Sequence, residues 1–201
     1  MEDTQTNSQE AQEAINRQEA INGHEANGTG RQWFVMRDLT RPNAKMPAYK
    51  MLEKMKIDFF TPMVHKLVMV NGKREDREVP FMQDLIFVHE VQAVIDPIVE
   101  NVHTFQYRFL KQRKPMTVRN ADMERFIQAV ESSENPKFYR PSEITPDMLS
   151  RKIRIIGGQL DGYEGTLLTL RGSKVKRLLV ELPTLLAAAV EVQPEFIRLI
   201  D

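Results

Sequence analysis

Residues 152–168 read KIRIIGGQLDGYEGTLL, and this stretch sets the fold of the C-terminal part of the chain. Apolar and polar residues alternate on both sides of a glycine cluster, which is typical of two half-buried strands. Glycine adopts positive φ angles readily and lets backbones approach closely, so the loop between the strands can turn sharply. The stretch therefore predicts strands over 152–156 and 165–170 and the beginning of a small β-barrel.

Three segments after the loop complete this barrel. Residues 174–182, 185–192 and 196–200 read as strands arranged around Pro183. The leucine and alanine residues of 185–190 are also compatible with a helix. However, Gly172 and Pro183 interrupt any long helix here, and the glycine loop needs a partner strand, so we expect a barrel of about five strands.

The preceding segment, residues 31–133, has the pattern of an α+β sandwich. The run 81–88 is apolar at most positions, so we expect it inside its sheet and covered on both faces. Asn71-Gly72 is a strong hairpin signal. The expected helices are interspersed with the strands and one helix ends the segment, and this order predicts one sheet covered by helices. The expected elements are a strand at 33–37, a helix after Pro47, strands at 57–64 and 66–70, the strand 81–88, a helix opened by Asp96-Pro97, a strand at 104–110 and a helix capped by Asn120.

The boundaries of this module follow from composition. Residues 1–30 are rich in Gln, Glu, Asn and Ala and poor in aliphatic residues, so they predict a disordered tail. Prolines at 136, 141 and 146 mark residues 134–150 as a linker, because proline interrupts regular structure. We therefore expect a domain at 31–133 and a barrel domain at 151–201 that can move independently.

Length and composition exclude several classes of protein. A chain of 201 residues can fill two small cores. It has no cysteine, which excludes disulfides and thiolate chemistry. No apolar run approaches the roughly 18 residues of a membrane helix, and the N-terminus lacks the pattern of a secretion signal. These features predict a cytoplasmic protein that does not enter a membrane.

The net charge of zero hides an uneven distribution. Residues 1–30 carry one basic and six acidic residues, whereas residues 31–140 carry 19 basic and 14 acidic ones. A basic excess of this size is compatible with a nucleic-acid contact and equally with a mixed, solvated surface. Charge alone therefore leaves both interpretations open.

No arrangement of residues predicts an enzyme. The four histidines, at positions 24, 65, 89 and 103, are scattered, and His89-Glu90 lacks the second histidine of a zinc-binding helix. The glycine loop lacks the Gly-Lys-Ser/Thr ending of a phosphate-binding loop. Asp161 and Glu164 lie near a turn without supporting groups for acid and base catalysis. We expect no catalytic residues, no cofactor and no metal.

The glycine loop resembles the KOW motif of the NusG family of transcription elongation factors. The similarity rests on Gly158, Leu160, Gly162 and Tyr163, with a further glycine at 165. KOW motifs also occur in ribosomal proteins, so the upstream residues decide. The resemblance implies an SH3-like KOW β-barrel at 151–201.

The segment 31–133 also resembles NusG, in the family's own domain order. Trp33-Phe34-Val35 is similar to the opening strand of the NusG N-terminal domain, and Thr61-Pro62-Met63 to its second strand. The run 81–88 stands where the family usually has Leu-Phe-Pro-Gly-Tyr-aliphatic-Phe-Val, but here residues 82–85 read Met-Gln-Asp-Leu. This departure suggests a specialised member, most similar to the antiterminators of Bacteroidales capsular polysaccharide operons.

The resemblance implies a non-enzymatic, monomeric factor whose N-terminal domain binds the RNA polymerase clamp and promotes elongation. By matched position, the polymerase-facing residues are Val35, Arg37, Leu85 and Phe87. The same apolar residues are equally compatible with an ordinary core, because alternate residues of a strand face opposite sides.

The resemblance also suggests contacts to non-template DNA or nascent RNA, through Lys50 and Lys54. Lys73 and Arg74 are well placed on a hairpin tip for the same role. In NusG the residue matching Tyr163 lies on a face that recruits a small-subunit ribosomal protein or Rho. An exposed tyrosine would suit a partner contact, whereas a loop tyrosine can also cap its own barrel. The alternative function is a KOW-containing RNA-binding or ribosome-associated module without polymerase affinity.

Overall fold

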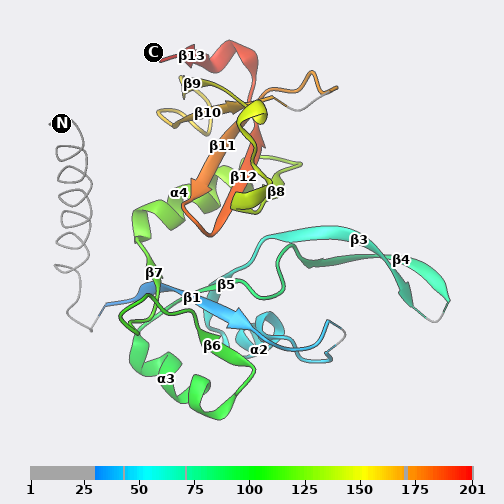
Figure 1. Ribbon diagram of the computed structural model, residues 1–201, viewed down its shortest axis with the longest axis vertical. Coiled ribbons are helices and arrows are strands. Elements are labelled where there is room, and N and C mark those ends of the chain that lie inside the picture. Colours follow the sequence, from blue (N-terminus) through cyan, green and yellow to red (C-terminus); the bar gives the residue numbers. More distant parts are fainter. Residues whose placement is uncertain (1–29, 43, 71, 170–171, 201) are drawn as a thin grey trace, which may run out of the picture.

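The computed structural model describes residues 30–42, 44–70, 72–169 and 172–200 of the chain. The tail predicted for residues 1–30 lies outside the described residues, apart from Gly30. The described chain forms two antiparallel sheets, a projecting hairpin and three α-helices (Figure 1).

The first sheet has five strands in the order β2–β5–β1–β6, with β7 also paired to β1. Along β1, alternate side chains enter different cores, because successive residues of a strand point to opposite faces. Both faces of the sheet are therefore buried, and the inner position of β5 confirms the prediction for residues 86–88 of the apolar run. The strands are β1 (Gln32–Asp38), β2 (Asp58–Phe60), β5 (Ile86–Glu90), β6 (Phe105–Tyr107) and β7 (Thr117–Val118).

Two helices cover one face of this sheet and a third covers the other. Helices α2 (Ala48–Met55) and α3 (Gln92–Asn101) pack Leu52 and Ile95 against Phe34 and Met36 of β1. Helix α4 (Asn120–Glu131) lies on the opposite face and buries Met123, Phe126 and Ala129. The α+β arrangement predicted for this module is confirmed.

The second sheet has six strands in the order β13–β9–β10–β11–β12–β8. Its segment 186–191 is a strand with five buried residues, so the prediction of strand rather than helix is confirmed there. Neighbouring strands satisfy the backbone groups of this segment and outweigh the helix propensity of leucine and alanine. The strands are β8 (Lys137–Tyr139), β9 (Leu149–Ile155), β10 (Glu164–Leu168), β11 (Arg177–Leu182), β12 (Leu186–Glu191) and β13 (Ile197–Leu199).

Three sequence-based expectations need correction. Residues 81–85 form a turn rather than the first half of a strand, and the Leu85 N–H donates to the Met82 carbonyl at 3.3 Å. Helix α3 begins at Gln92, so Pro97 lies inside it instead of opening it. Residues 134–150 are not a free linker, because they contain β8 and two short 3₁₀ helices, Pro141–Glu143 and Pro146–Met148.

Helix α4 joins the two sheets through one continuous apolar cluster. Its side chains meet Val35 and Phe87 on the side of the first sheet, and Leu178 and Leu186 on the side of the second. In Figure 1 the helix lies between the two sheets. The two sheets therefore share a core in this structure, which differs from the expectation of independent domains.

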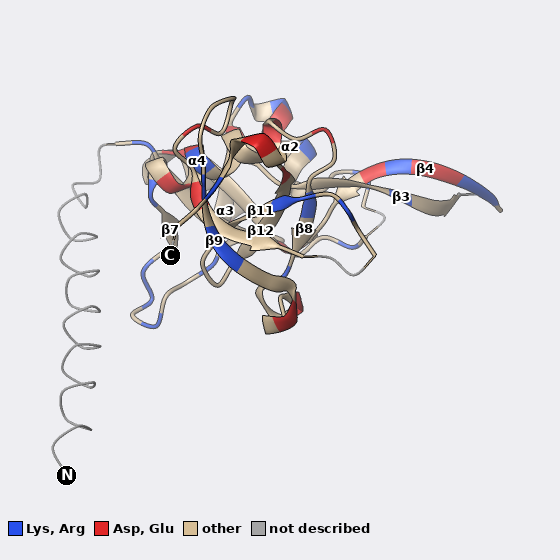
Figure 2. Cartoon of the chain, turned by 90° about the horizontal axis from the view of Figure 1, so that it is seen from above, with Lys and Arg blue, Asp and Glu red and all other residues tan. Residues whose placement is uncertain are grey.

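The hairpin formed by β3 (Met63–Val70) and β4 (Lys73–Pro80) projects from this body. Its register runs from Met63 opposite Pro80 to Val70 opposite Lys73, as the turn signal at 71–72 predicts. Figure 2 shows acidic and basic residues alternating along β4. Leu67 and Met69 are 71% and 65% exposed, so the hairpin adds little to the core.

Gly165 in β10 provides a test of how closely the second sheet is packed. A Cβ atom there would lie 2.6 Å from the Leu179 carbonyl oxygen and 2.8 Å from Leu178 Cδ1, so β11 would have to shift. We expect Gly165→Ala to destabilise the protein by about 1–3 kcal/mol, measured by urea unfolding. Gly30→Ala, where no atom lies within 4 Å of the added Cβ, is the control. Equal unfolding midpoints would contradict the packing described here.

Candidate functional site

The residues predicted to face the polymerase do not form an exposed patch. Val35, Leu85 and Phe87 are each 0% exposed, whereas Arg37 is exposed. Aromatic rings fill the space above Phe87, since Phe60 lies 6.3 Å from the Phe87 ring and 6.0 Å from the Phe126 ring of α4. In this conformation only Arg37 can contact a partner directly.

The glycine loop packs its tyrosine against α4. The Tyr163 hydroxyl lies 3.0 Å from the Arg125 carbonyl oxygen and 2.8 Å from Gln128 Oε1, within hydrogen-bond distance of both. The Arg125 guanidinium lies 4.5 Å from the centre of the Tyr163 ring, at the distance of a cation–π contact. Burial raises the pKa of Tyr163, although the charge of Arg125 opposes the shift. The hydroxyl is therefore a hydrogen-bond donor at neutral pH.

Two further contacts bind the same loop to the helix. The Gln128 side chain donates to the Gln159 carbonyl at 3.3 Å, and Arg125 donates to the Glu164 carbonyl at 3.4 Å. Arg125 and Gln128, together with Ala121, Asp161 and Tyr163, line an open depression between the helix and the loop. The depression is thus a seam between two parts of one chain.

Of the predicted partner-binding residues, only the glycines are accessible. Gly158 and Gly162 are exposed, whereas Leu160 and Tyr163 are 6% and 7% exposed. The sequence left open whether Tyr163 is exposed or packed inside the molecule, and in this conformation its ring and hydroxyl pack inside the molecule. Sequence reasoning missed Arg125 and Gln128, although their spacing of three positions, beside the buried stripe of α4, places them on one side of that helix.

The four predicted nucleic-acid contacts are exposed but lie on two separate elements. Lys50 and Lys54 are on α2, and Lys73 and Arg74 are at the start of β4. Figures 1 and 2 both show the hairpin tip pointing away from α2. The structure therefore does not combine the four into one site.

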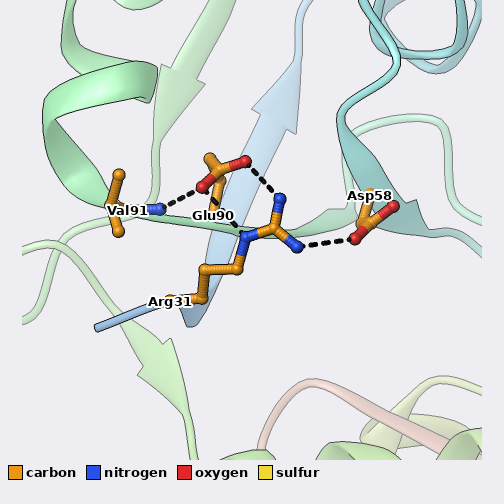
Figure 3. A network of polar contacts seen from close by, with 4 residues as sticks. All are labelled: Arg31, Asp58, Glu90 and Val91. Carbon is orange, nitrogen blue, oxygen red and sulfur yellow. Dashed lines mark hydrogen bonds and ion pairs between the residues drawn. The ribbon is translucent and has the colours of Figure 1, made fainter.

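A network of ion pairs holds the beginning of the first sheet. Arg31 donates through Nε and Nη2 to the Glu90 carboxylate at 3.1 and 2.8 Å, and its Nη1 reaches Asp58 at 3.1 Å (Figure 3). The Val91 N–H, at the start of α3, also donates to Glu90 at 2.9 Å. Hydrogen bonding by Arg31, supported by Val91, lowers the pKa of Glu90. One carboxylate thus connects β1, β5 and α3.

The described residues contain no group of three or more His, Asp or Glu side chains placed to hold a metal ion. Within the same described part of the chain, no helix is both long and apolar enough to cross a membrane.

The family model that matches residues 31–127 is described as "Transcription termination factor nusG", so this part of the chain is similar to a transcription termination factor. The family is NusG, and the match covers just under half of the chain. This confirms the resemblance for the N-terminal module. Comparison with curated proteins found no match.

One solved structure with a similar chain is titled "Domain interaction in Thermotoga maritima NusG". It is 12% identical, with a TM-score of 0.45, and the alignment covers 87% of this chain and 100% of that one.

The Glu90 network predicts how stability depends on pH. Because the pKa of Glu90 in the folded protein is below its ordinary value of 4.5, its contribution is present above that value and is lost as the pH falls through the folded pKa. We expect Glu90→Gln to lower the melting temperature at pH 7 and to have progressively less effect below about pH 4. Glu100→Gln, which replaces an exposed carboxylate on α3, is the control. A melting difference that does not change with pH would contradict the assignment.

The Tyr163 contacts predict that a single hydroxyl stabilises the seam. Tyr163→Phe removes the donor and leaves the Gln128 and Arg125 oxygens without it, which we expect to cost about 1–3 kcal/mol in urea unfolding. Tyr139→Phe is the matched control, since the Tyr139 hydroxyl makes no hydrogen bond within the described part of the chain. The result would count against the seam if both variants unfolded at the same urea concentration.

Proposed function

We propose that the chain is a specialised NusG-like antiterminator that binds RNA polymerase and promotes elongation through a long operon. The observation that carries the proposal is the NusG-family domain at 31–127, followed by a second antiparallel sheet with the glycine loop 157–165. The resemblance to NusG implies an interaction with RNA polymerase. The unusual residues 82–85 support a specialised member similar to the antiterminators of Bacteroidales capsular polysaccharide operons.

The polymerase clamp contact proposed for the first sheet has two parts. Arg37 is exposed and can meet an acidic group of a partner directly. Val35, Leu85 and Phe87 are buried, so they would meet a partner only after the covering aromatic residues and α4 move aside. Exposing these side chains to water costs about 25 cal/mol of free energy per Å² of apolar area, and the free energy of partner binding would have to offset that cost.

The proposed nucleic-acid contacts act through phosphates. Lys50, Lys54, Lys73 and Arg74 are exposed cations that can pair with the backbone of non-template DNA or nascent RNA. Such contacts supply affinity without reading sequence. Because they stand on two elements, α2 and the hairpin would touch different stretches of nucleic acid.

We propose that the second sheet is an SH3-like KOW barrel. Its partner would be a small-subunit ribosomal protein or Rho, recruited through Gly158, Leu160, Gly162 and Tyr163. Leu160 and Tyr163 pack against α4 in this conformation, so recruitment by these two side chains requires the seam to open.

Pull-down of purified core RNA polymerase, free of nucleic acid, tests the proposal. We expect the wild-type chain to retain polymerase and Arg37→Glu to retain several-fold less, because the variant reverses an exposed charge without entering the core. Arg198→Glu, on β13 of the second sheet, is the control with the same charge change. Failure of the wild-type chain to retain polymerase would reject the proposal.

The alternative is a KOW-containing RNA-binding or ribosome-associated module. Recovery of ribosomes without polymerase from a lysate would favour it over the antiterminator. Transcript mapping after deletion of the coding sequence then separates a specialised from a general factor. Loss of promoter-distal reads in one long operon supports the specialised factor, and loss across many operons contradicts it.

A further inference from the structure

A small hairpin between β6 and β7 carries a group of features that none of the sites above uses. It consists of residues 108–116 and is called here the basic hairpin. Its base is fixed to β1, because the Arg108 N–H donates to the Val35 carbonyl at 2.8 Å and the Val35 N–H donates to the Met116 carbonyl at 2.8 Å. Its two arms are joined by the Met116 N–H, which donates to the Arg108 carbonyl at 2.7 Å. The base of the basic hairpin is therefore anchored to β1, an inner strand of the first sheet.

The turn at the tip has a defined geometry. The Leu110 N–H donates to the Lys114 carbonyl at 2.9 Å, and the Arg113 N–H donates back to the Leu110 carbonyl at 3.0 Å. Arg113 closes this three-residue turn at φ 59°, a left-handed conformation that usually favours glycine. The chain thus places a large cation where the backbone geometry would suit a residue without a side chain.

The basic hairpin carries charge of one sign. It contains four basic and no acidic residues, and only Arg108 has an acidic partner, Asp84, at 3.6 Å. The exposed side chains of Lys111, Arg113 and Lys114 form no ion pair with any of the described residues. On β4, by contrast, basic and acidic side chains alternate, and Arg77 pairs with Glu75 at 2.8 Å. The tip of the basic hairpin is therefore an uncompensated cationic patch.

An aromatic ring stands beside these cations. Phe109 is 55% exposed, and its ring meets Tyr107 edge-on at 6.0 Å. Tyr107 in turn meets Phe34 edge-on at 5.6 Å and donates its hydroxyl to Asp96 at 2.8 Å. Burial, with Asp96 as a smaller cause, raises the pKa of Tyr107, so this donor keeps its proton. A series of three rings thus supports Phe109 from the core outward while leaving much of its ring in solvent.

We infer that the basic hairpin binds single-stranded nucleic acid, with Phe109 stacking on a base and Lys111, Arg113 and Lys114 pairing with phosphates. An exposed ring next to unpaired cations is the combination that single-stranded nucleic acid requires, since every unpaired base offers a stacking face. A duplex would use the cations but not the ring. An anionic lipid surface would also contact both the cations and the ring, but in the basic hairpin only Phe109 and Leu110 are exposed large apolar residues. The inference adds a site to the proposed function and does not depend on polymerase binding.

Fluorescence anisotropy with the full chain and labelled 12-nucleotide RNA and DNA, without polymerase, tests the inference. We expect Phe109→Ala and Phe109→Leu each to weaken binding roughly fivefold or more, because neither side chain offers an aromatic face. Phe109→Trp should bind at least as well as the wild-type chain. Equal affinity of all four proteins would overturn the stacking role.

Salt dependence tests the cations separately. Replacing Lys111, Arg113 and Lys114 with glutamine should reduce the slope of log affinity against log salt by about 2, at roughly 0.7 per phosphate contact on a single strand. The control replaces Lys174, Lys176 and Arg198 with glutamine, which changes the same charge on the second half of the chain. An equal change of slope in both triple variants would overturn the assignment of the site.

Two further measurements separate weaker binding from unfolding of the hairpin and compare the single strand with other anionic ligands. Arg113→Gly removes one cation and suits the left-handed turn, so weaker binding by this variant cannot be attributed to an unfolded hairpin. Duplex DNA and phosphatidylserine vesicles serve as competing ligands in the same assay. Preference for either one over the single strand, with no effect of Phe109→Ala, would overturn the inference in favour of a simple charge contact.

Discussion

The packing of α4 against two sheets is the constraint on which the rest of the structure depends. A helix of 12 residues normally buries one stripe, but here Met123, Phe126 and Ala129 are fully buried while Ile127 and Val130 are half-buried beside them. This wide apolar surface can fill the space between two sheets. Separating the sheets would return part of that surface to water, and the cost rises with the area exposed.

Apolar packing alone does not decide how the second sheet sits on α4, because the hydrophobic effect has no direction. The polar contacts around Tyr163 supply direction. A buried hydroxyl must find its acceptors, so the positions of Arg125 and Gln128 on the helix fix where the glycine loop rests. The same contacts withdraw Tyr163 from solvent. The seam is thus both a structural joint and the place where partner binding and intramolecular packing compete for one side chain.

The fold also distributes basic and acidic residues unevenly among its elements, although the net charge of the chain is zero. Along β4, bands of acidic and basic side chains alternate, Arg77 pairs with Glu75, and Asp76 lies 3.2 Å from His65 of β3, so charges of both signs balance along the projecting hairpin. The basic hairpin gathers cations of one sign beside an exposed ring. The part of the chain that matches the NusG family model therefore has exposed basic side chains, whereas its apolar face is covered in this structure.

Local patterns in the sequence determined much of this protein. The alternation around 152–168, the turn signal at 71–72 and the apolar run ending at Val88 correctly predicted strands, a hairpin and an inner strand, because these features depend on backbone preference and on which face is buried. What only the tertiary structure decided was the use of those residues. The prolines of residues 134–150 predicted a linker. In the structure β8 pairs with β12 through backbone hydrogen bonds, which the pattern of side chains does not predict. Likewise, the pattern of apolar residues around Leu85 is the same whether their side of the sheet is open to solvent or covered. The helix that covers it, α4, lies 35 or more positions later in the chain. The exposure of a side chain depends on contacts between segments that are far apart in the sequence, and local sequence patterns do not reveal those contacts.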